Sequence, residues 1–167
     1  WMIYHIPGRA AVEVTLDTLS AIKAQSPHFA GMKHAAQDIG LVARCVTTLG
    51  PDFRVFAGLE ELSFPMLATG ACGVMNALGN LVPERIARLC DVVRAGDLAA
   101  ARTLHIDLLE LSQAVFFDTN PMPIKYMMKR LGLIAANQHR RPMVAASAEL
   151  ERWLEQAARQ KVRARTL

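Results

Sequence analysis

Four short apolar segments alternate with segments of helical period over the first 96 residues, and this alternation most constrains the fold. We expect strands over residues 1–4, 30–33, 54–58 and 72–76. Each is followed by apolar residues at helical spacing, which begin near a capping residue or a proline and end near a glycine. Strands and helices that alternate in this way form βαβ units with a parallel sheet covered by helices.

Beyond residue 96 the strand signal disappears and three helices are expected, over residues 98–115, over residues 123–131 and from residue 147. The sequence therefore predicts half of a barrel over residues 1–96 and a C-terminal helical domain over residues 97–167. A closed (β/α)₈ barrel needs eight units in roughly 250 residues. The 167 residues contain four such units.

Composition favours a folded globular domain, because 52% of the residues are hydrophobic and the mean hydropathy is positive. No apolar run is long enough to span a bilayer and no secretory signal is evident, so we expect a cytoplasmic protein without membrane contact. The three cysteines are widely spaced, which favours reduced thiols over a disulfide framework. The five histidines show no metal-binding spacing, so we expect no metal site.

The net charge of +4 could suggest a nucleic-acid partner. However, acidic and basic residues are interspersed, and residues 159–165 form the only basic cluster. Aromatic residues are not interleaved with a basic patch, as single-stranded nucleic-acid binding would require. We therefore expect no nucleic-acid partner.

Lys33 is a lone charge at the end of a small apolar run, Phe29 to Met32. Most such lysines are solvated surface charges. Desolvation beside apolar surface would instead favour the neutral amine, which can attack a carbonyl. Gly31 shares a strand face with Lys33, since side chains alternate with period two, and we expect this glycine to leave space beside the amine.

Tyr4 ends the first predicted strand as Lys33 ends the second. In parallel barrels catalytic groups lie at the carboxyl ends of the strands. Adjacent strands are about 4.8 Å apart, so the phenol and the amine could meet and exchange protons. A purely structural alternative is that Tyr4 simply completes a buried strand.

Residues 4–9 read Tyr-His-Ile-Pro-Gly-Arg and resemble the YNVPGR segment of the dihydrodipicolinate synthase and N-acetylneuraminate lyase family. Residues 31–33 resemble its GIK segment, and residues 70–75, 95–98 and 119–125 resemble later segments. The resemblance implies a (β/α)₈ TIM barrel of α/β class, of which this chain covers strands five to eight with a C-terminal helical extension. It also implies a homo-oligomer, a dimer or tetramer, that uses pyruvate as a Schiff-base partner.

By this resemblance, Lys33 forms an imine with pyruvate and Tyr4 relays protons. Arg9 matches the residue that receives the carboxylate of the aldehyde substrate, most simply aspartate semialdehyde. Gly58 and Met75 match positions whose backbone lines the pyruvate pocket. The covalent lysine imine requires no cofactor. Without the resemblance, Arg9 could be a surface ion-pair partner and Met75 could be packing.

Departures from the family pattern keep alternatives open. Ala10 stands where the synthases commonly have threonine, and His34-Ala35-Ala36 replaces their Glu-Ala-Thr. A sister pyruvate lyase or aldolase that cleaves a sugar-derived or aromatic 4-hydroxy-2-oxo acid is one alternative. A non-catalytic half-barrel interaction subunit is the other, because four strands of the barrel are missing from an otherwise intact pattern. The family's Gly-Thr-Thr-Gly-Glu segment, which binds the pyruvate carboxylate, belongs to the missing half.

Overall fold

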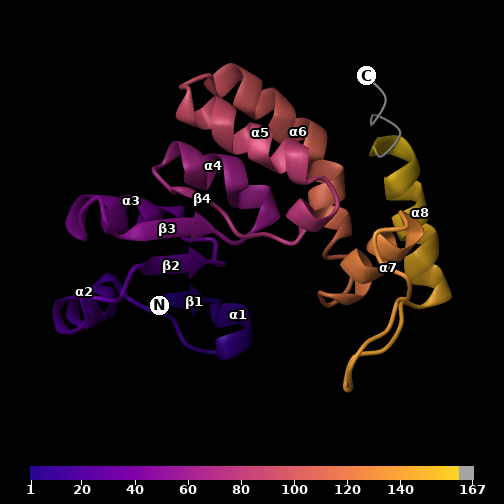
Figure 1. Cartoon of the computed structure of the whole chain (residues 1–167), viewed down its shortest axis with the longest axis horizontal. Helices are drawn as coiled ribbons and strands as arrows, with labels where there is room; N and C mark the ends of the chain where they lie inside the picture. The colour runs from indigo at the N-terminus through magenta and orange to yellow at the C-terminus, as the bar shows by residue number, and fades with distance from the viewer. Residues whose placement is uncertain (162–167) are drawn as a thin grey trace.

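Four parallel strands form the sheet, in the order in which they occur along the chain (Figure 1). In this computed structural model, which describes residues 1–161, they are β1 (Met2–His5), β2 (Gly31–His34), β3 (Arg54–Ala57) and β4 (Gly73–Val74). The parallel sheet predicted from the sequence is thus confirmed. β4 is shorter than predicted, because it pairs with β3 only at Phe56 and Ala57 before the chain turns away.

Helices follow each strand at the predicted places. They are α2 (Leu16–Gln25), α3 (Ile39–Thr48), the 3₁₀ turn η1 (Glu60–Leu62) with α4 (Ser63–Ala68), and the turn η2 (Leu78–Asn80) with α5 (Pro83–Arg94). The side chains of Thr15 and Asp38 cap α2 and α3, because each accepts a hydrogen bond from a backbone N–H group in the first turn of its helix. A short helix, α1 (Pro7–Ala10), lies between β1 and α2, and Pro7 is accommodated at its first position.

Three helices complete the described chain: α6 (Leu98–Ala114), α7 (Met122–Arg130) and α8 (Ala148–Lys161). The arrowheads of the strands in Figure 1 point toward the side on which α7 and α8 lie. Leu108 and Leu111 of α6 share a buried cluster with Met127 of α7 and Leu154 of α8. The division at residue 96 stays a prediction. Residues 162–167, which include part of the predicted basic cluster, lie outside the described residues.

The two faces of the sheet differ in cover. Met32, Val55 and Ala57 are buried against Leu19 of α2 and Val42 of α3, so we call their side the covered face. Because side chains alternate along a strand, the neighbours of these residues project from the opposite side, which we call the open face. Lys33 therefore belongs to the open face and His34 to the covered face.

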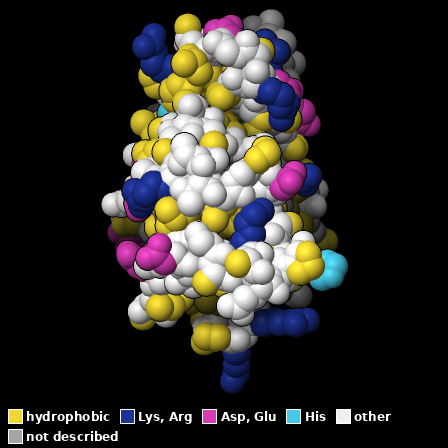
Figure 2. Space-filling model, turned by 90° about the vertical axis from the view of Figure 1, so that its left-hand side faces the viewer, with side chains coloured by type: hydrophobic (Ala, Val, Ile, Leu, Met, Phe, Trp, Pro, Cys, Tyr) yellow, Lys and Arg dark blue, Asp and Glu magenta, His cyan; other side chains and the backbone are white. Residues whose placement is uncertain are grey.

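No helix in the described part of the chain is long and apolar enough to cross a membrane. On the surface shown in Figure 2, basic and acidic side chains are interspersed among apolar ones rather than gathered into one basic patch. This agrees with the charge pattern of the sequence for that face.

Candidate active site

Tyr4, Lys33 and Phe56 form one row across the open face. Tyr4 lies opposite Lys33 in the β1–β2 register, and Lys33 lies opposite Phe56 in the β2–β3 register. The Lys33 Nζ atom lies 4.1 Å from the centroid of the Tyr4 ring. An ammonium over an aromatic face is attracted by the ring quadrupole. The structure thus brings the two predicted catalytic residues into contact, with the amine resting on the ring face and Tyr4 still 53% exposed.

Gly58, rather than Gly31, is the glycine that gives Lys33 its space. A Cβ atom on Gly58 would lie 3.0 Å from Lys33 Cε, from the carbonyl oxygen of His34 and from Ala35 Cβ. A Cβ on Gly31 would lie 2.0 Å from the carbonyl oxygen of Arg54. The prediction that Gly31 opens a space beside the amine is therefore wrong, because its missing side chain lets β2 and β3 approach each other.

Glu60 is a buried carboxylate that the sequence reasoning missed. Its Oε1 accepts hydrogen bonds from the backbone N–H groups of Ala77 at 2.5 Å and Leu78 at 3.2 Å, which ties the η1 turn to the segment after β4. Its Oε2 is buried with no hydrogen-bond partner among the described residues. Burial raises the pKa of Glu60, while those backbone bonds and the charge of Lys33 oppose the rise. The carboxyl group of Glu60 thus lies within electrostatic reach of the Lys33 amine.

The remaining two predicted residues lie nearby in the topology but make other contacts. Met75 directly follows β4, its backbone N–H donates to the carbonyl oxygen of Ala57 at 2.8 Å, and its side chain is 40% exposed. Arg9 is exposed on α1, and its Nη2 donates to the carbonyl oxygen of Asn120 at 3.2 Å. Arg9 therefore links α1 to the connection between α6 and α7.

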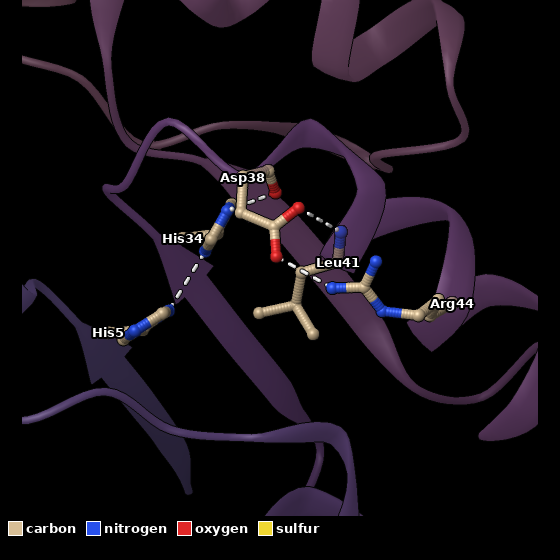
Figure 3. Close-up of polar contacts among 5 residues, drawn as sticks. All are labelled: His5, His34, Asp38, Leu41 and Arg44. Carbon is tan, nitrogen blue, oxygen red and sulfur yellow. Dashed lines mark hydrogen bonds and ion pairs between the residues drawn. The ribbon is translucent and has the colours of Figure 1, made fainter.

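The next residue on each strand, His5 on β1 and His34 on β2, lies on the covered face, and the two are register partners. Their Nδ1 atoms lie 3.0 Å apart, and both rings are buried (Figure 3). His34 Nε2 lies 2.9 Å from the carbonyl oxygen of Asp38, whose carboxylate accepts hydrogen bonds from the Leu41 N–H and from Arg44. The signal for this pair was present in the sequence, because each histidine directly follows a predicted catalytic residue.

Two hollows of about 720 and 620 Å³ open near the carboxyl ends of the strands. Residues of the β1–α2 and β2–α3 connections line the larger, and Glu60 lines the smaller together with residues of α6. Neither is lined by Lys33 or Tyr4, because those side chains project from the open face, which four strands do not enclose. Within residues 1–161, no group of three potential metal ligands comes together.

Comparison with known proteins identifies the family. The model of the dihydrodipicolinate synthetase family matches residues 1–161. A 4-hydroxy-tetrahydrodipicolinate synthase of Thermus thermophilus is 39% identical over 157 residues, which are 94% of this chain and 52% of that protein. The synthase of Oleidesulfovibrio alaskensis is 35% identical over 154 residues, with 92% and 52% covered. The chain thus spans about half the length of these relatives.

Solved structures show the same relationship in three dimensions. Dihydrodipicolinate synthase from Aquifex aeolicus superimposes with a TM-score of 0.92 at 30% identity, covering 95% of this chain and 54% of that one. The enzyme from Thermotoga maritima gives a TM-score of 0.91 at 31% identity, covering 96% and 55%. The four βα units and the helices after them therefore have the TIM-barrel fold of these synthases, over part of its length. Sequence and fold agree that this chain belongs to the dihydrodipicolinate synthetase family.

Proposed function

We propose that the whole protein is a Schiff-base-forming lyase of the dihydrodipicolinate synthase type. In this proposal it condenses pyruvate with an aldehyde, aspartate semialdehyde, through an imine on Lys33. β1 to β4 are then the fifth to eighth strands of the barrel. The observation that carries the proposal is the position of Lys33, whose amine contacts Tyr4 and whose side chain fits against the bare backbone of Gly58.

The chemistry follows from the neighbours of the amine. The neutral amine of Lys33 adds to the ketone carbon of pyruvate, and loss of water leaves a protonated imine. Loss of a methyl proton gives an enamine, whose carbon attacks the aldehyde, and hydrolysis then frees the product and the amine. The Tyr4 hydroxyl is the proton relay, which requires a rotation from the ring-face contact that the structure shows.

In this proposal further strands complete the site over the open face. Tyr4 is more than half exposed, and a reactive imine needs exclusion of bulk water. In the proposed whole protein the preceding barrel strands supply this cover and the groups that bind the pyruvate carboxylate. Arg9 then binds the carboxylate of the aldehyde through its planar fork of donors, after release from Asn120.

Borohydride trapping tests the proposal. The whole protein incubated with pyruvate and sodium borohydride should gain one pyruvate-derived mass, located on Lys33 by peptide mapping. Lys33→Ala should gain none, whereas Lys23→Ala should react like the unaltered protein. Lys23 is the matched control, because its Nζ also lies over an aromatic ring, 5.7 Å from the centroid of Phe53. An adduct on another lysine, or none at all, would refute the Lys33 mechanism.

One observation favours a second candidate, a sister lyase that cleaves a different 4-hydroxy-2-oxo acid. Arg9 is held by the carbonyl oxygen of Asn120, and Ala10 supplies no hydroxyl beside it. Substrate profiling separates the two. Efficient turnover of pyruvate with aspartate semialdehyde supports the synthase, while trapping of pyruvate without that turnover supports the sister lyase.

The proposed homo-oligomer is tested by sedimentation of the whole protein.

A further inference from the structure

The strand ends that carry Tyr4 and Lys33 meet at a buried histidine pair. His5 is 4% exposed and His34 is 0% exposed, and the two are register partners on β1 and β2. This row is also the last rung of the sheet: Ala35 N–H donates to the carbonyl oxygen of His5 at 2.8 Å, and Gly58 N–H donates to that of His34 at 2.8 Å. Beyond this rung the strands end.

Hydrogen-bond chemistry fixes the protonation of the pair. A carbonyl oxygen only accepts, so His34 Nε2 carries the proton that it donates to Asp38. Burial lowers the pKa of His34 and so favours its neutral form. In that form its Nδ1 is an acceptor, and His5 donates to it through its own Nδ1–H. His5 Nε2 is left unprotonated, and it is buried with no hydrogen-bond partner among the described residues. The donors therefore point in one direction, from β1 to β2 and on to the carbonyl oxygen of Asp38.

Asp38 connects this chain of bonds to a helix. Its Oδ1 accepts the Leu41 N–H at 3.0 Å as the cap of α3, and its Oδ2 pairs with Arg44 at 2.6 Å. Figure 3 shows these contacts continuing from His5 through His34 to the first turn of α3. The end of β1 is therefore tied through two side chains to a capped helix.

Packing alone does not account for the pair. Two apolar side chains of similar volume would fill the same space without leaving a buried nitrogen unsatisfied, which costs free energy. A directional hydrogen bond fixes the end of β1 relative to the end of β2, which apolar side chains would not do. Both positions also depart from the family segments that the sequence resembles, where Asn and Glu stand.

We propose that the His5–His34 hydrogen bond, anchored to α3 through Asp38, is a clamp that positions Tyr4 and Lys33 beside each other. The inference rests on the proposed function for its catalytic consequence. Each histidine adjoins one of the two reacting residues along its strand, so a shift of either strand end displaces Lys33 relative to Tyr4. Both histidines act as positioning residues, because their side chains lie on the face opposite the amine.

The principal test compares variants of His5 in the whole protein. His5→Asn keeps a donor nitrogen at the δ position, whereas His5→Leu removes it. We expect His5→Leu and His34→Leu each to slow borohydride trapping of pyruvate about five- to tenfold, the net worth of one hydrogen bond. His5→Asn should restore most of the rate, and the double leucine variant should be no slower than the slower single variant. His105→Leu, which removes a half-buried histidine elsewhere, should stay within about twofold.

Two further measurements keep the clamp testable apart from the lyase proposal. Acetylation of Lys33 relative to Lys23 needs no pyruvate. The leucine variants should raise this ratio about threefold, because Lys33 loses its cation–π contact with Tyr4. In ¹⁵N-labelled unaltered protein, a scalar coupling between the two Nδ1 atoms should report the bond directly, whether or not the variants fold. Failure of the unaltered protein to trap pyruvate would refute the lyase proposal alone. An unchanged acetylation ratio in both leucine variants, or an absent coupling, would overturn the clamp.

Discussion

The two faces of one four-stranded sheet have opposite characters, although their residues alternate along the same strands. On the open face the Lys33 amine lies over the ring of Tyr4, and Tyr4 is about half exposed. One residue further along each strand, the covered face presents His5 and His34 in a buried, directional hydrogen bond. The comparison shows that the two side chains proposed to be catalytic are accessible on one face, while the next residue on each strand is buried and hydrogen-bonded on the other.

We expect the largest effect from Lys33→Arg, which should lower turnover strongly and leave stability nearly unchanged. Arginine keeps the positive charge and can still lie over the Tyr4 ring, but it cannot form the imine. We expect turnover to fall by roughly a thousandfold or more, as when an enzymatic nucleophile is removed. The midpoint of thermal unfolding should barely move, because a partly exposed cation–π contact contributes only about 0.5–1 kcal/mol. If Lys33→Arg keeps its turnover, the chemistry does not occur on the open face.

A methionine on the covered face should show the reverse pattern. Met32 is 0% exposed and belongs to the core between sheet and helices, so Met32→Ala should lower the free energy of unfolding by about 2–5 kcal/mol. Met75, which is 40% exposed, is the matched control, and Met75→Ala should cost less than about 1 kcal/mol. Denaturant titration measures both. Equal losses would contradict the difference in burial between the two positions.

Gly58→Ala probes the junction of the two faces. The new Cβ would crowd Lys33 Cε on one side and the His34 carbonyl on the other, each at 3.0 Å. We expect pyruvate trapping to slow by roughly ten- to a hundredfold through displacement of the amine. Gly8→Ala is the control, since no atom lies within 4 Å of a Cβ there. Comparable trapping rates in the two variants would show that Lys33 does not need the space beside Gly58.

The pH dependence of stability should report the covered face. Burial lowers the pKa of His5 from the ordinary 6.5, against the opposing charges of Glu13 and Asp38. Burial also lowers the pKa of His34, against its hydrogen bond to the Asp38 backbone and the charge of Asp38. Below pH 6.5 these two histidines therefore bind more protons in the unfolded chain than in the folded protein, and their contribution to stability falls as the pH falls. This loss of stability is complete once the pH is below the pKa values of His5 and His34 in the folded protein.

Urea unfolding at about pH 7.5 and about pH 5.5 measures this smallest effect. The double variant His5→Asn/His34→Leu should lose less stability between the two conditions than the unaltered protein does. His28→Asn, which changes an exposed histidine, should leave the difference as it was. An equal pH dependence in the double variant would show that the pair does not titrate as its burial requires.

The sequence predicted the parts of the structure that depend on local pattern and on alternation. Apolar periodicity predicted a helix after each strand, among them α2 and α3. The contact between Tyr4 and Lys33 could be expected because both residues end neighbouring parallel strands. In these cases a local rule and the tertiary structure require the same arrangement.

The missed features depend on contacts between distant segments. The pattern around Gly31 does not show that the Arg54 carbonyl occupies the adjacent space. Glu60 reads as one of two surface acids, and only the return of the chain after β4 brings the backbone N–H groups that bind it. The bond between His5 and His34 could have been inferred from the strand register, but its anchor through Asp38 depends on the path into α3.

A crystal structure of the whole protein soaked with pyruvate would decide whether Lys33 is the nucleophile. We expect continuous covalent density from the Lys33 Nζ atom to the ketone carbon of pyruvate, on the face that carries Tyr4, with His5 and His34 still bonded behind it. Pyruvate attached to a different lysine, or Lys33 unmodified over the Tyr4 ring at saturating pyruvate, would show that the open face is not where the chemistry occurs.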